Sequence, residues 1–571
     1  MKRSRASLAP PSEQCVEQLE TWRTQFGAEA EAAKITLLDA LPGAFPQEAS
    51  LLLRLHEALC FIKAYPDSPA VLHRVNRLLY EFADRPEVAR ARRKLDETGI
   101  ITTTTVYPFS YPMACWLAQS YPAHVDIAWD CYADPAPLDR ILVLLTTLAE
   151  HPGIDDEHVS SAEWLANAAG GGNAFVSLIN RFNTMSCDEM TRQSLYDSLA
   201  LPLRLTLGKD FPSRTTAAIN VKKPYYHREP LRRGAIDLRR ELQRLPARRR
   251  LSRNETSRLI NLARACMAVR HRELEAFDYA SPDDGLLYEC GRGLRIVMIG
   301  LQPARRLFLE SVYAGLLLKN GVPIGYTLAS GLFESSEVAY NVFETFRGGE
   351  SSWIFGRVLA VVYDLFRPTD FTVMRYQIGY ENDEALSSGA CWFYYNLGFE
   401  PRGRAVVNLL RAEREKLRRD PRYRSPRRVL RRLSRENIYF HLGEPRDELI
   451  GLFPYENIGH QVTHHIARAY GGDPIRAVQT ATANVAQRLG VTDLSAWPSA
   501  EREAFRRWSV MIELFPDLDQ WSSAQKRQLI RILRAKGGRH EARFVRLSNR
   551  HQRLRTSIYQ LARAWTWDDA E

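Results

Sequence analysis

The sequence lacks the features that mark exported, disulfide-bonded or zinc-binding proteins. Its 571 residues include only eight cysteines, which are scattered along the chain without any C-x-x-C pair. Disulfide frameworks and zinc ribbons need regular cysteine spacing, so we expect free thiols in a reducing compartment. The basic start, Met1–Arg5, is followed by Pro10 and Pro11 and not by an apolar stretch, which argues against a signal peptide.

Long apolar runs are also missing. The longest covers residues 141–145 and is continued by Leu148 and Ala149, far short of the roughly 20 residues that a membrane-spanning helix needs. Hydrophobic residues make up 45% of the chain and charged residues 25%, which excludes a disordered or collagen-like protein and favours packed globular domains. We therefore expect a cytoplasmic protein that does not contact a membrane.

The chain is too long for one hydrophobic core, since such cores stop growing near ~250–300 residues. We predict a multidomain α and α+β protein in which predominantly α-helical N- and C-terminal domains flank a central mixed β-sheet with helices. The predicted units are a mostly helical N-terminal region of one or two subdomains (1–250), a sheet domain with a leading helix (251–405), an arginine-rich linker or helix (406–454) and a helical C-terminal domain (455–571).

Helix signals dominate the two outer regions. Apolar residues between 71 and 82 recur at helical spacing behind Ser68, which is followed by proline at the first helical position. Ser252 and Ser522 each begin a Ser-x-x-Glu/Gln capping box and so predict two more helix starts. Residues 100–210 contain a threonine run, and we interpret them as mostly helical.

Positive charge is in excess, with a net charge of +11 at pH 7. Eleven arginines lie between Arg228 and Arg258, and a second arginine-dense stretch runs from Arg402 to Arg435. Long-range attraction to nucleic acid, to CoA phosphates or to an acidic protein is one interpretation. Solvated amphipathic helices are the other, because leucines and acidic residues such as Glu413 are interleaved at helical spacing.

Two further patterns predict no cofactor site. His460 and His464 lie one helical turn apart, but no acidic or cysteine partner at ligand spacing accompanies them, so we predict no metal site. The glycine run 170–172 lacks the lysine and the serine or threonine of a phosphate-binding P-loop, which favours a flexible connection.

Strand signals concentrate in the centre of the chain. Residues 294–299 and 311–318 form two apolar runs. Lys319-Asn320-Gly321 is typical of a hairpin turn, which leads into a return strand over 322–326. We therefore expect an antiparallel meander, with a further strand over 337–344.

The next segment predicts an anion site. A glycine-containing turn over 346–352 opens a helix over 353–366. This arrangement directs free backbone N–H groups and the positive end of the helix dipole at one point. A strand over 371–378 and a helix over 384–397 follow. The predicted order is therefore three strands, a helix, a strand and a helix.

In this order and with these residues, 290–405 resembles the GNAT superfamily of acyl-CoA-dependent N-acyltransferases, over about one fifth of the chain. Three pieces carry the resemblance: the hairpin at 319–321, the strand and loop at 342–352, and the closing helix at 387–399. In that helix the family places an asparagine, an alanine, a tyrosine and a final Gly-Phe. The matching residues are Ser387, Ala390, Tyr394, Gly398 and Phe399, so only the asparagine is replaced.

The resemblance implies an enzyme that transfers an acyl group from acetyl-CoA, or from another acyl-CoA, to an amine of a protein or a small molecule. Attack by an amine on a thioester needs a proton acceptor and a proton donor. By resemblance, Glu337 is the general base and Tyr394 protonates the sulfur of CoA. The plainer interpretations are a salt-bridged strand residue for Glu337 and a half-buried helix aromatic for Tyr394.

The resemblance also assigns the contacts to the acyl-CoA. Backbone groups near Val342 and Glu344 would hold the pantetheine arm and polarise the thioester carbonyl. Ser387 stands at the family's asparagine position. The pyrophosphate loop would comprise Arg347, Gly348, Gly349, Ser351 and Ser352.

Two departures from the family pattern bear on this function. Glu350 takes the place of the first glycine of the pyrophosphate loop. A carboxylate 4 Å from a phosphate would repel it by about 4 kcal/mol at an effective dielectric of about 20, unless it points outward or caps the helix. The interval between 294–299 and 311–318 is too short for the family's two acceptor-site helices, for which a helix at 253–271 could substitute.

The alternative function is a non-catalytic scaffold. Such a protein would keep a degenerate acyltransferase fold and would bind nucleic acid or an acidic protein through its basic helices.

Overall fold

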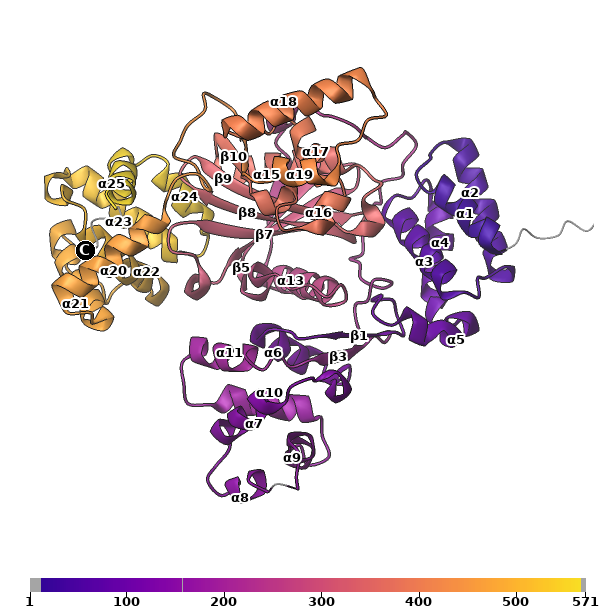
Figure 1. Ribbon diagram of the computed structural model, residues 1–571, viewed down its shortest axis with the longest axis horizontal. Coiled ribbons are helices and arrows are strands. Elements are labelled where there is room, and N and C mark those ends of the chain that lie inside the picture. Colours follow the sequence, from indigo (N-terminus) through magenta and orange to yellow (C-terminus); the bar gives the residue numbers. More distant parts are fainter. Residues whose placement is uncertain (1–11, 157, 566–571) are drawn as a thin grey trace, which may run out of the picture.

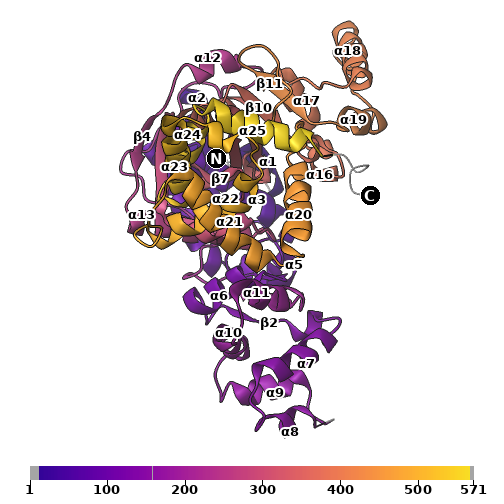
Figure 2. The ribbon, with the colours of Figure 1, turned by 90° about the vertical axis from the view of Figure 1, so that its left-hand side faces the viewer.

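The computed structural model describes residues 12–156 and 158–565, so the basic start of the chain lies outside the described residues. Figure 1 shows a central β-sheet with helices on both faces, a helical unit at each end of the sheet and a further unit that projects from one side. The turned view in Figure 2 shows the same projection, which ends at α8 (His151–Ile154) and α9 (Ser161–Ala168). The predicted combination of a mixed sheet with flanking helical regions is confirmed.

The N-terminal unit is helical, as predicted. The side chain of Ser68 accepts a hydrogen bond from the backbone N–H of Val71 at 3.3 Å and caps the fourth helix. The buried residues Val75 and Leu78 of that helix join the main core. The helices are α1 (Ser12–Trp22), α2 (Ala28–Ala40), α3 (Ala49–Ala64), α4 (Pro69–Glu81) and α5 (Pro86–Leu95).

The projecting unit combines helices with a three-stranded antiparallel sheet of order β1-β3-β2. Helices are its commonest elements, but they cover less than half of residues 100–210, and the threonine run enters a strand. Its apolar side chains, among them Trp116 and Phe175, form a core separate from the main one. Besides α8 and α9, its elements are β1 (Thr104–Tyr107), α6 (Tyr111–Ser120), β2 (Val125–Ile127), α7 (Ala136–Leu142), α10 (Ala174–Thr184), α11 (Glu189–Asp197) and β3 (Leu203–Thr206).

The central sheet contains eight strands in the order in which they occur in the chain. Neighbours are antiparallel except β9 and β10, which run parallel and are connected by α15 (Ser351–Phe366). The sheet extends beyond the predicted range 251–405, and β4, β5 and β11 had no strand prediction. Its strands are β4 (Ala247–Arg250), β5 (Ala280–Gly291), β6 (Leu294–Leu301), β7 (Ser311–Lys319), β8 (Val322–Leu332), β9 (Ser335–Val342), β10 (Asp370–Val373) and β11 (Ile438–His441).

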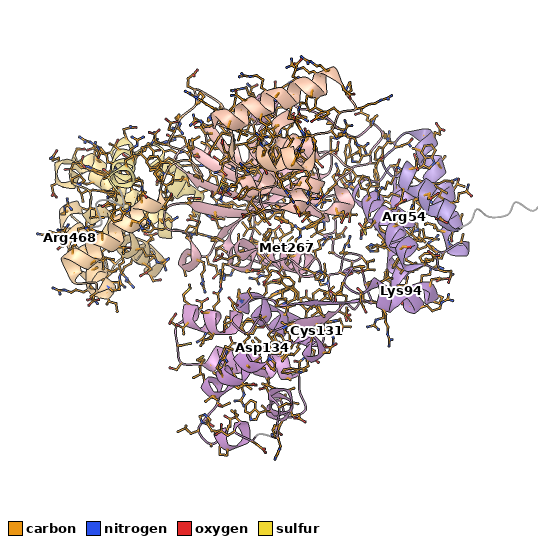
Figure 3. All side chains as sticks on the ribbon, in the orientation of Figure 1. Arg54, Lys94, Cys131, Asp134, Met267 and Arg468 are labelled. Atoms are coloured by element: carbon orange, nitrogen blue, oxygen red, sulfur yellow. The ribbon has the colours of Figure 1, made fainter. Side chains whose placement is uncertain are left out.

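The helix α13 (Arg253–Ala268) lies across the sheet from α15 and is buried on two sides (Figure 1). Met267 belongs to the main core, whereas Ala265 and Ala268 belong to the core of the projecting unit. Figure 3 shows Met267 among the side chains that fill the space between these two parts. A helix that is apolar on most of its surface is buried between layers. The capping box predicted at Ser252 is present at its start.

The strand predicted over 371–378 is correct only for its first three residues. The strand β10 ends at Val373, because its partner β11 has only four residues to pair with it. Arg375–Ile378 instead form a short 3-10 helix, η7, whose first backbone N–H donates to the side chain of Asn437 at 2.9 Å.

The single helix predicted over 384–397 is divided in two. Gly389 lies between the halves with a φ of 79°, a left-handed conformation that favours glycine and interrupts a helix. The halves are α16 (Asp383–Ser387) and α17 (Ala390–Asn396). The other helices of this part of the chain are α12 (Leu238–Leu242), α14 (Glu275–Asp278), α18 (Arg404–Arg419) and α19 (Arg427–Leu433).

The C-terminal unit is helical, as predicted. The capping box at Ser522 is present at the start of its fourth helix. Over the described ranges, no helix is both long and apolar enough to cross a membrane. The helices are α20 (Glu456–Tyr470), α21 (Pro474–Leu489), α22 (Ser499–Glu513), α23 (Ser523–Gly537), α24 (Ala542–Ser548) and α25 (Gln552–Arg563).

A buried ion cluster fixes the start of α15. Glu350 is 0% exposed, and its carboxylate accepts hydrogen bonds from Lys319 Nζ at 2.8 Å and from Arg292 Nε at 3.0 Å. The backbone N–H of Arg232 donates a third at 3.2 Å, and the Lys319 ammonium lies 4.7 Å from the centre of the Tyr65 ring. Burial lowers the pKa of Lys319 to about 8, although the Glu350 carboxylate opposes this shift.

Replacing Glu350 with glutamine should destabilise the fold, because two buried cations lose their counter-ion. Removing one partner of a buried pair costs about 3–5 kcal/mol. Glu229→Gln is the matched control, since Glu229 lies 3.8 Å from the same Arg292 but its side chain is 78% exposed; an exposed pair contributes less than ~1 kcal/mol. Chemical denaturation measures both variants, and equal free energies of unfolding would contradict the buried cluster.

Candidate functional site

The two parallel strands of the central sheet diverge. The pairing of β9 with β10 is limited to Ser335–Glu337, while β9 continues to its end at Val342. The carbonyl of Ala339 accepts a hydrogen bond from the hydroxyl of Thr327 at 2.7 Å, and the backbone N–H of Phe343 donates to the carbonyl of Ile324 at 2.9 Å. Because both partners belong to β8, the backbone groups of Tyr340 and Val342 face the gap between β9 and β10. Within the described residues, no strand pairs with β9 along this part of the gap. The result is a short open strand edge inside the protein.

A cavity of about 230 Å³ lies at this open edge. Four residues predicted from the sequence meet there, namely Val342, Arg347, Ser351 and Tyr394. They come from the end of β9, from the loop after it, from the first turn of α15 and from α17. The rest of the wall is formed by Tyr340, Asn341, Gln377, Asn382, Glu384, Ala385, Ser388, Ala390 and Phe393.

The other predicted contact residues do not line this cavity. Glu344 and Gly348 are exposed, and Ser352 is half-buried in the first turn of α15. Gly349 packs against the N-terminal unit, where an added Cβ would lie 2.6 Å from a tyrosine hydroxyl. Ser387 is exposed and donates its hydroxyl to a backbone carbonyl of its own helix at 2.8 Å.

Sequence reasoning missed Tyr340 and Glu384 as cavity residues. Tyr340 and Val342 are two positions apart in a predicted strand. Because successive side chains of a strand point to opposite faces, these two lie on the same face. Nothing in the sequence marks Glu384, because its position depends on the break between α16 and α17.

Tyr394 lines the cavity and is held in an aromatic cluster. The residue is 2% exposed, and the ring centres of Phe355, Phe393 and Phe399 lie 5.3, 5.1 and 5.9 Å from its own. No hydrogen-bond partner for its hydroxyl is found among the described residues. Burial raises the pKa of Tyr394 far above its usual value, so the phenol stays protonated.

Arg347 is bound by an acidic residue on the opposite wall. Its guanidinium forms an ion pair with Glu384, and its Nε donates to the carbonyl of Val342 at 3.2 Å. Arg272 binds the same carboxylate at 2.9 Å. Burial alone would raise the pKa of Glu384, but the two guanidinium groups outweigh it and lower the pKa. The Glu384 carboxylate therefore binds both arginines at the mouth of the cavity, Arg347 and Arg272.

Glu350 does not line this cavity, point outward or cap α15, so none of the three positions considered from the sequence is observed. Its side chain makes no capping hydrogen bond. The carboxylate is turned inward to Lys319 and Arg292, which neutralise it. The repulsion expected for a bound pyrophosphate is therefore cancelled by two cations.

Glu337 lies in a second cavity, of about 760 Å³, on the other side of η7. A second carboxylate, Glu310, lines the same cavity. Burial, and then the charge of Glu310, raise the pKa of Glu337 to about 7, which is the range in which a carboxylate can act as a general base. Glu337 and Tyr394 therefore line two different cavities. Both cavities border the strand β9 and the short helix η7.

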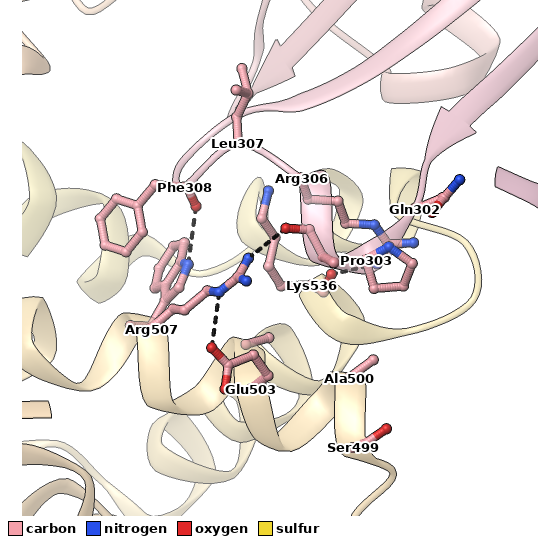
Figure 4. A pocket seen from close by; sticks show the side chains of 13 residues that line it. Gln302, Pro303, Arg306, Leu307, Phe308, Ser499, Ala500, Glu503, Arg507 and Lys536 are labelled. Carbon is pink, nitrogen blue, oxygen red and sulfur yellow. Dashed lines mark hydrogen bonds and ion pairs between the residues drawn. The ribbon is translucent and has the colours of Figure 1, made fainter. Parts of the chain in front are cut away.

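A third cavity, of about 420 Å³, lies between the β6–β7 loop and α22 (Figure 4). Its charged side chains are paired. Arg507 binds Glu503 at 3.1 Å, while Arg306 and Lys536 bind Glu541 at 3.6 and 2.6 Å. Because its ionisable groups form ion pairs, this cavity offers no free base.

The two histidines considered as metal ligands pack on a tryptophan. The ring centres of His460 and His464 lie 5.6 and 5.8 Å from that of Trp565. In the part of the chain that the structure describes, no group of three or more His, Cys, Asp or Glu residues is arranged to hold a metal ion.

Comparison with other proteins leaves the site to be judged by its own geometry. No family model matches the sequence, and neither a curated protein nor a solved structure is significantly similar to the chain.

Proposed function

We propose that this chain is an acyl-CoA-dependent N-acyltransferase of the GNAT type. The observation that carries the proposal is the divergence of β9 and β10 beside a cavity that gathers Val342, Arg347, Ser351 and Tyr394. The resemblance in sequence implied contacts to CoA at these four residues. That they converge in space, although they span more than fifty positions of the chain, supports the proposal.

The open edge of β9 suits the pantetheine arm of an acyl-CoA. Pantetheine contains two amide groups in an extended chain, and an extended chain binds well along an unpaired strand edge. The backbone groups of Tyr340 and the N–H of Val342 supply that edge, whereas the carbonyl of Val342 already accepts a hydrogen bond from Arg347 Nε at 3.2 Å. On this proposal the start of α15 and Arg347 bind the pyrophosphate, since helix N-termini and guanidinium groups both favour phosphate oxygens.

The proposed chemistry assigns one proton transfer to each cavity. Glu337 takes the proton from the ammonium of the acceptor, and the free amine attacks the thioester carbonyl. The C–N bond forms and the C–S bond breaks. Tyr394 donates its hydroxyl proton to the departing sulfur, while the nitrogen releases its second proton to solvent as the amide forms. Tyr394 then regains a proton from solvent, and Glu337 releases to solvent the proton that it took from the ammonium. The raised pKa of Glu337 supports the first role, because a buried carboxylate holds a proton more strongly than an exposed one.

Glu384 acts against CoA binding on this proposal. Its carboxylate occupies Arg347 and Arg272, so a pyrophosphate has to displace it. Glu384→Gln should therefore bind acetyl-CoA about tenfold more tightly, and Arg347→Ala about tenfold more weakly, since a charge-assisted hydrogen bond contributes about 1.5 kcal/mol or more.

Isothermal titration with acetyl-CoA and a longer acyl-CoA measures both changes. Glu400→Gln is the control, because Glu400 also pairs with an arginine, Arg414, but does not line the cavity. Absence of acyl-CoA binding at millimolar concentration in every variant would sink the transferase proposal and favour a scaffold that keeps only the shape.

The pH profile tests the base. Because Glu337 must be ionised to accept a proton, kcat/KM should rise with pH through about 7, as followed by release of free CoA thiol with a panel of primary amines. Glu337→Gln should lower kcat/KM by about 10²–10⁴ and remove this limb. Glu310→Gln should keep the limb but shift it to lower pH, because a neighbouring negative charge is lost. A limb that survives in Glu337→Gln would exclude it as the base.

The proton donor is tested by a pair of adjacent tyrosines. Tyr394→Phe should lower kcat by at least about 100-fold, the contribution of a positioned acid, with little change in acyl-CoA affinity. Tyr395→Phe should keep its activity, since the Tyr395 hydroxyl donates to the carbonyl of Leu433 at 2.7 Å and lies outside the cavity. Equal rates for the two variants would remove Tyr394 from the mechanism.

A further inference from the structure

Arginines from two elements surround a cavity at the β4 edge of the sheet. The cavity has a volume of about 450 Å³ and lies between β4, the C-terminal end of α15 and α24. Its basic residues are Arg248, Arg249, Arg250, His540, Arg543 and Arg546. Its apolar surface is formed by Leu286, Tyr313, Leu365 and Ala542.

Three of these arginines are used by the fold itself. Arg248 pairs with Asp364 at 2.6 Å, and Arg249 pairs with Glu255 at 2.9 Å. Arg546 donates to two backbone carbonyls at the end of α15 and so caps that helix. Structural needs therefore explain these three.

The side chains of Arg250 and Arg543 form no such ion pair or capping contact in the part of the chain that the structure describes. Among the described residues, no carboxylate lies within ion-pair distance of either. The remaining acid at the cavity, Asp284, is held by the fold: its carboxylate accepts hydrogen bonds from the hydroxyl of Tyr313 and from the backbone N–H of Glu541, and it lies 3.0 Å from His540 Nδ1. Burial and the charge of Arg248 lower the pKa of Arg546, a sign that positive charges are crowded here.

Protection of a sheet edge does not account for the whole cluster. Charged residues on an edge strand do prevent edge-to-edge pairing, and this explains arginines on β4. Arg543 and Arg546, however, come from α24 and close the cavity from the other side. Two elements therefore contribute positive charge to one concave space.

We propose that this cavity binds a phosphorylated organic molecule of nucleotide size. Guanidinium groups bind phosphate oxygens in pairs of hydrogen bonds, and Arg250 and Arg543 are available for this. Leu286 and Ala542, which are 7% and 8% exposed, provide a small apolar surface for the organic part. The volume falls in the range of about 300–1,000 Å³ that is typical of small-molecule sites.

A small ligand fits better than a nucleic acid strand. A strand needs a basic track that continues beyond one cavity. The next arginines, Arg253 and Arg539, share one carboxylate, that of Asp283, so part of the positive charge is already neutralised where the track would continue.

This site is separate from the proposed acyl-CoA site. The two cavities adjoin opposite ends of α15, whose 16 residues span roughly 24 Å at 1.5 Å per residue. The inference therefore does not depend on the transferase proposal.

Isothermal titration of the full chain with ATP as the probe tests the proposal. The double variant Arg250→Ala and Arg543→Ala should bind ATP about 100-fold more weakly, at about tenfold for each arginine. The double variant Arg253→Ala and Arg539→Ala removes the same charge outside the cavity and should bind ATP like the unchanged chain. Thermal unfolding confirms that each variant is folded.

Four results would overturn the proposal. These are no ATP binding at millimolar concentration, an equal loss in both double variants, inorganic tripolyphosphate binding as tightly as ATP, and a single-stranded oligonucleotide binding more tightly than ATP. Acetyl-CoA distinguishes the two sites: its affinity should fall in Arg347→Ala and stay unchanged in the double variant at Arg250 and Arg543. Loss of acetyl-CoA binding in that double variant would place CoA itself in this cavity.

Discussion

The position of α15 depends on one buried carboxylate. Glu350 binds Lys319 at the end of β7, Arg292 in the turn after β5 and the backbone of the segment that precedes α12. Tyr65, from the N-terminal unit, packs against the same ammonium group. Four parts of the chain that are far apart in sequence are therefore joined at the first turn of one helix. Their relative positions are set by a single neutralised charge.

The open strand edge follows from that position. Because α15 connects β9 to β10 across one face, the two strands run parallel, and parallel strands need such a crossover. The strand β10 is short, so it pairs with the first part of β9 only. The end of β9, Arg347 and the start of α15 then border one cavity. An inward Glu350 leaves that cavity free of its negative charge, which the proposed binding of a pyrophosphate requires.

Local signals in the sequence predicted much of this arrangement. Hydrophobic runs and the hairpin at 319–321 identified β6 to β9, and capping boxes at Ser252 and Ser522 identified two helix starts, because these features depend on neighbouring residues. The strands β4, β5 and β11 were missed for a physical reason. The strand β4 is an exposed run of arginines, β5 begins with a polar Ser-Pro-Asp-Asp segment, and β11 gains its order only by pairing with β10.

The candidate site was predictable only in part. Val342, Arg347, Ser351 and Tyr394 follow a pattern that can be read along the chain. The direction of Glu350 cannot, because its two cationic partners lie more than thirty and more than fifty residues away. The position of Glu384 could not be predicted either, because it depends on the break between α16 and α17 at Gly389. Side chains whose energy depends on distant charges are the ones that sequence reasoning leaves undecided.

Charge shows the same contrast between local and distant information. A net charge of +11 suggests a basic protein with anionic partners, yet many arginines are consumed within the fold. Arg239 binds two backbone carbonyls of the β11 end, and Arg248 neutralises Asp364. What attracts a ligand is therefore not the total charge but the arginines that the fold leaves unpaired. Because Arg250 and Arg543 adjoin one cavity, their charges act together, and a multiply charged phosphate is the anion that matches them.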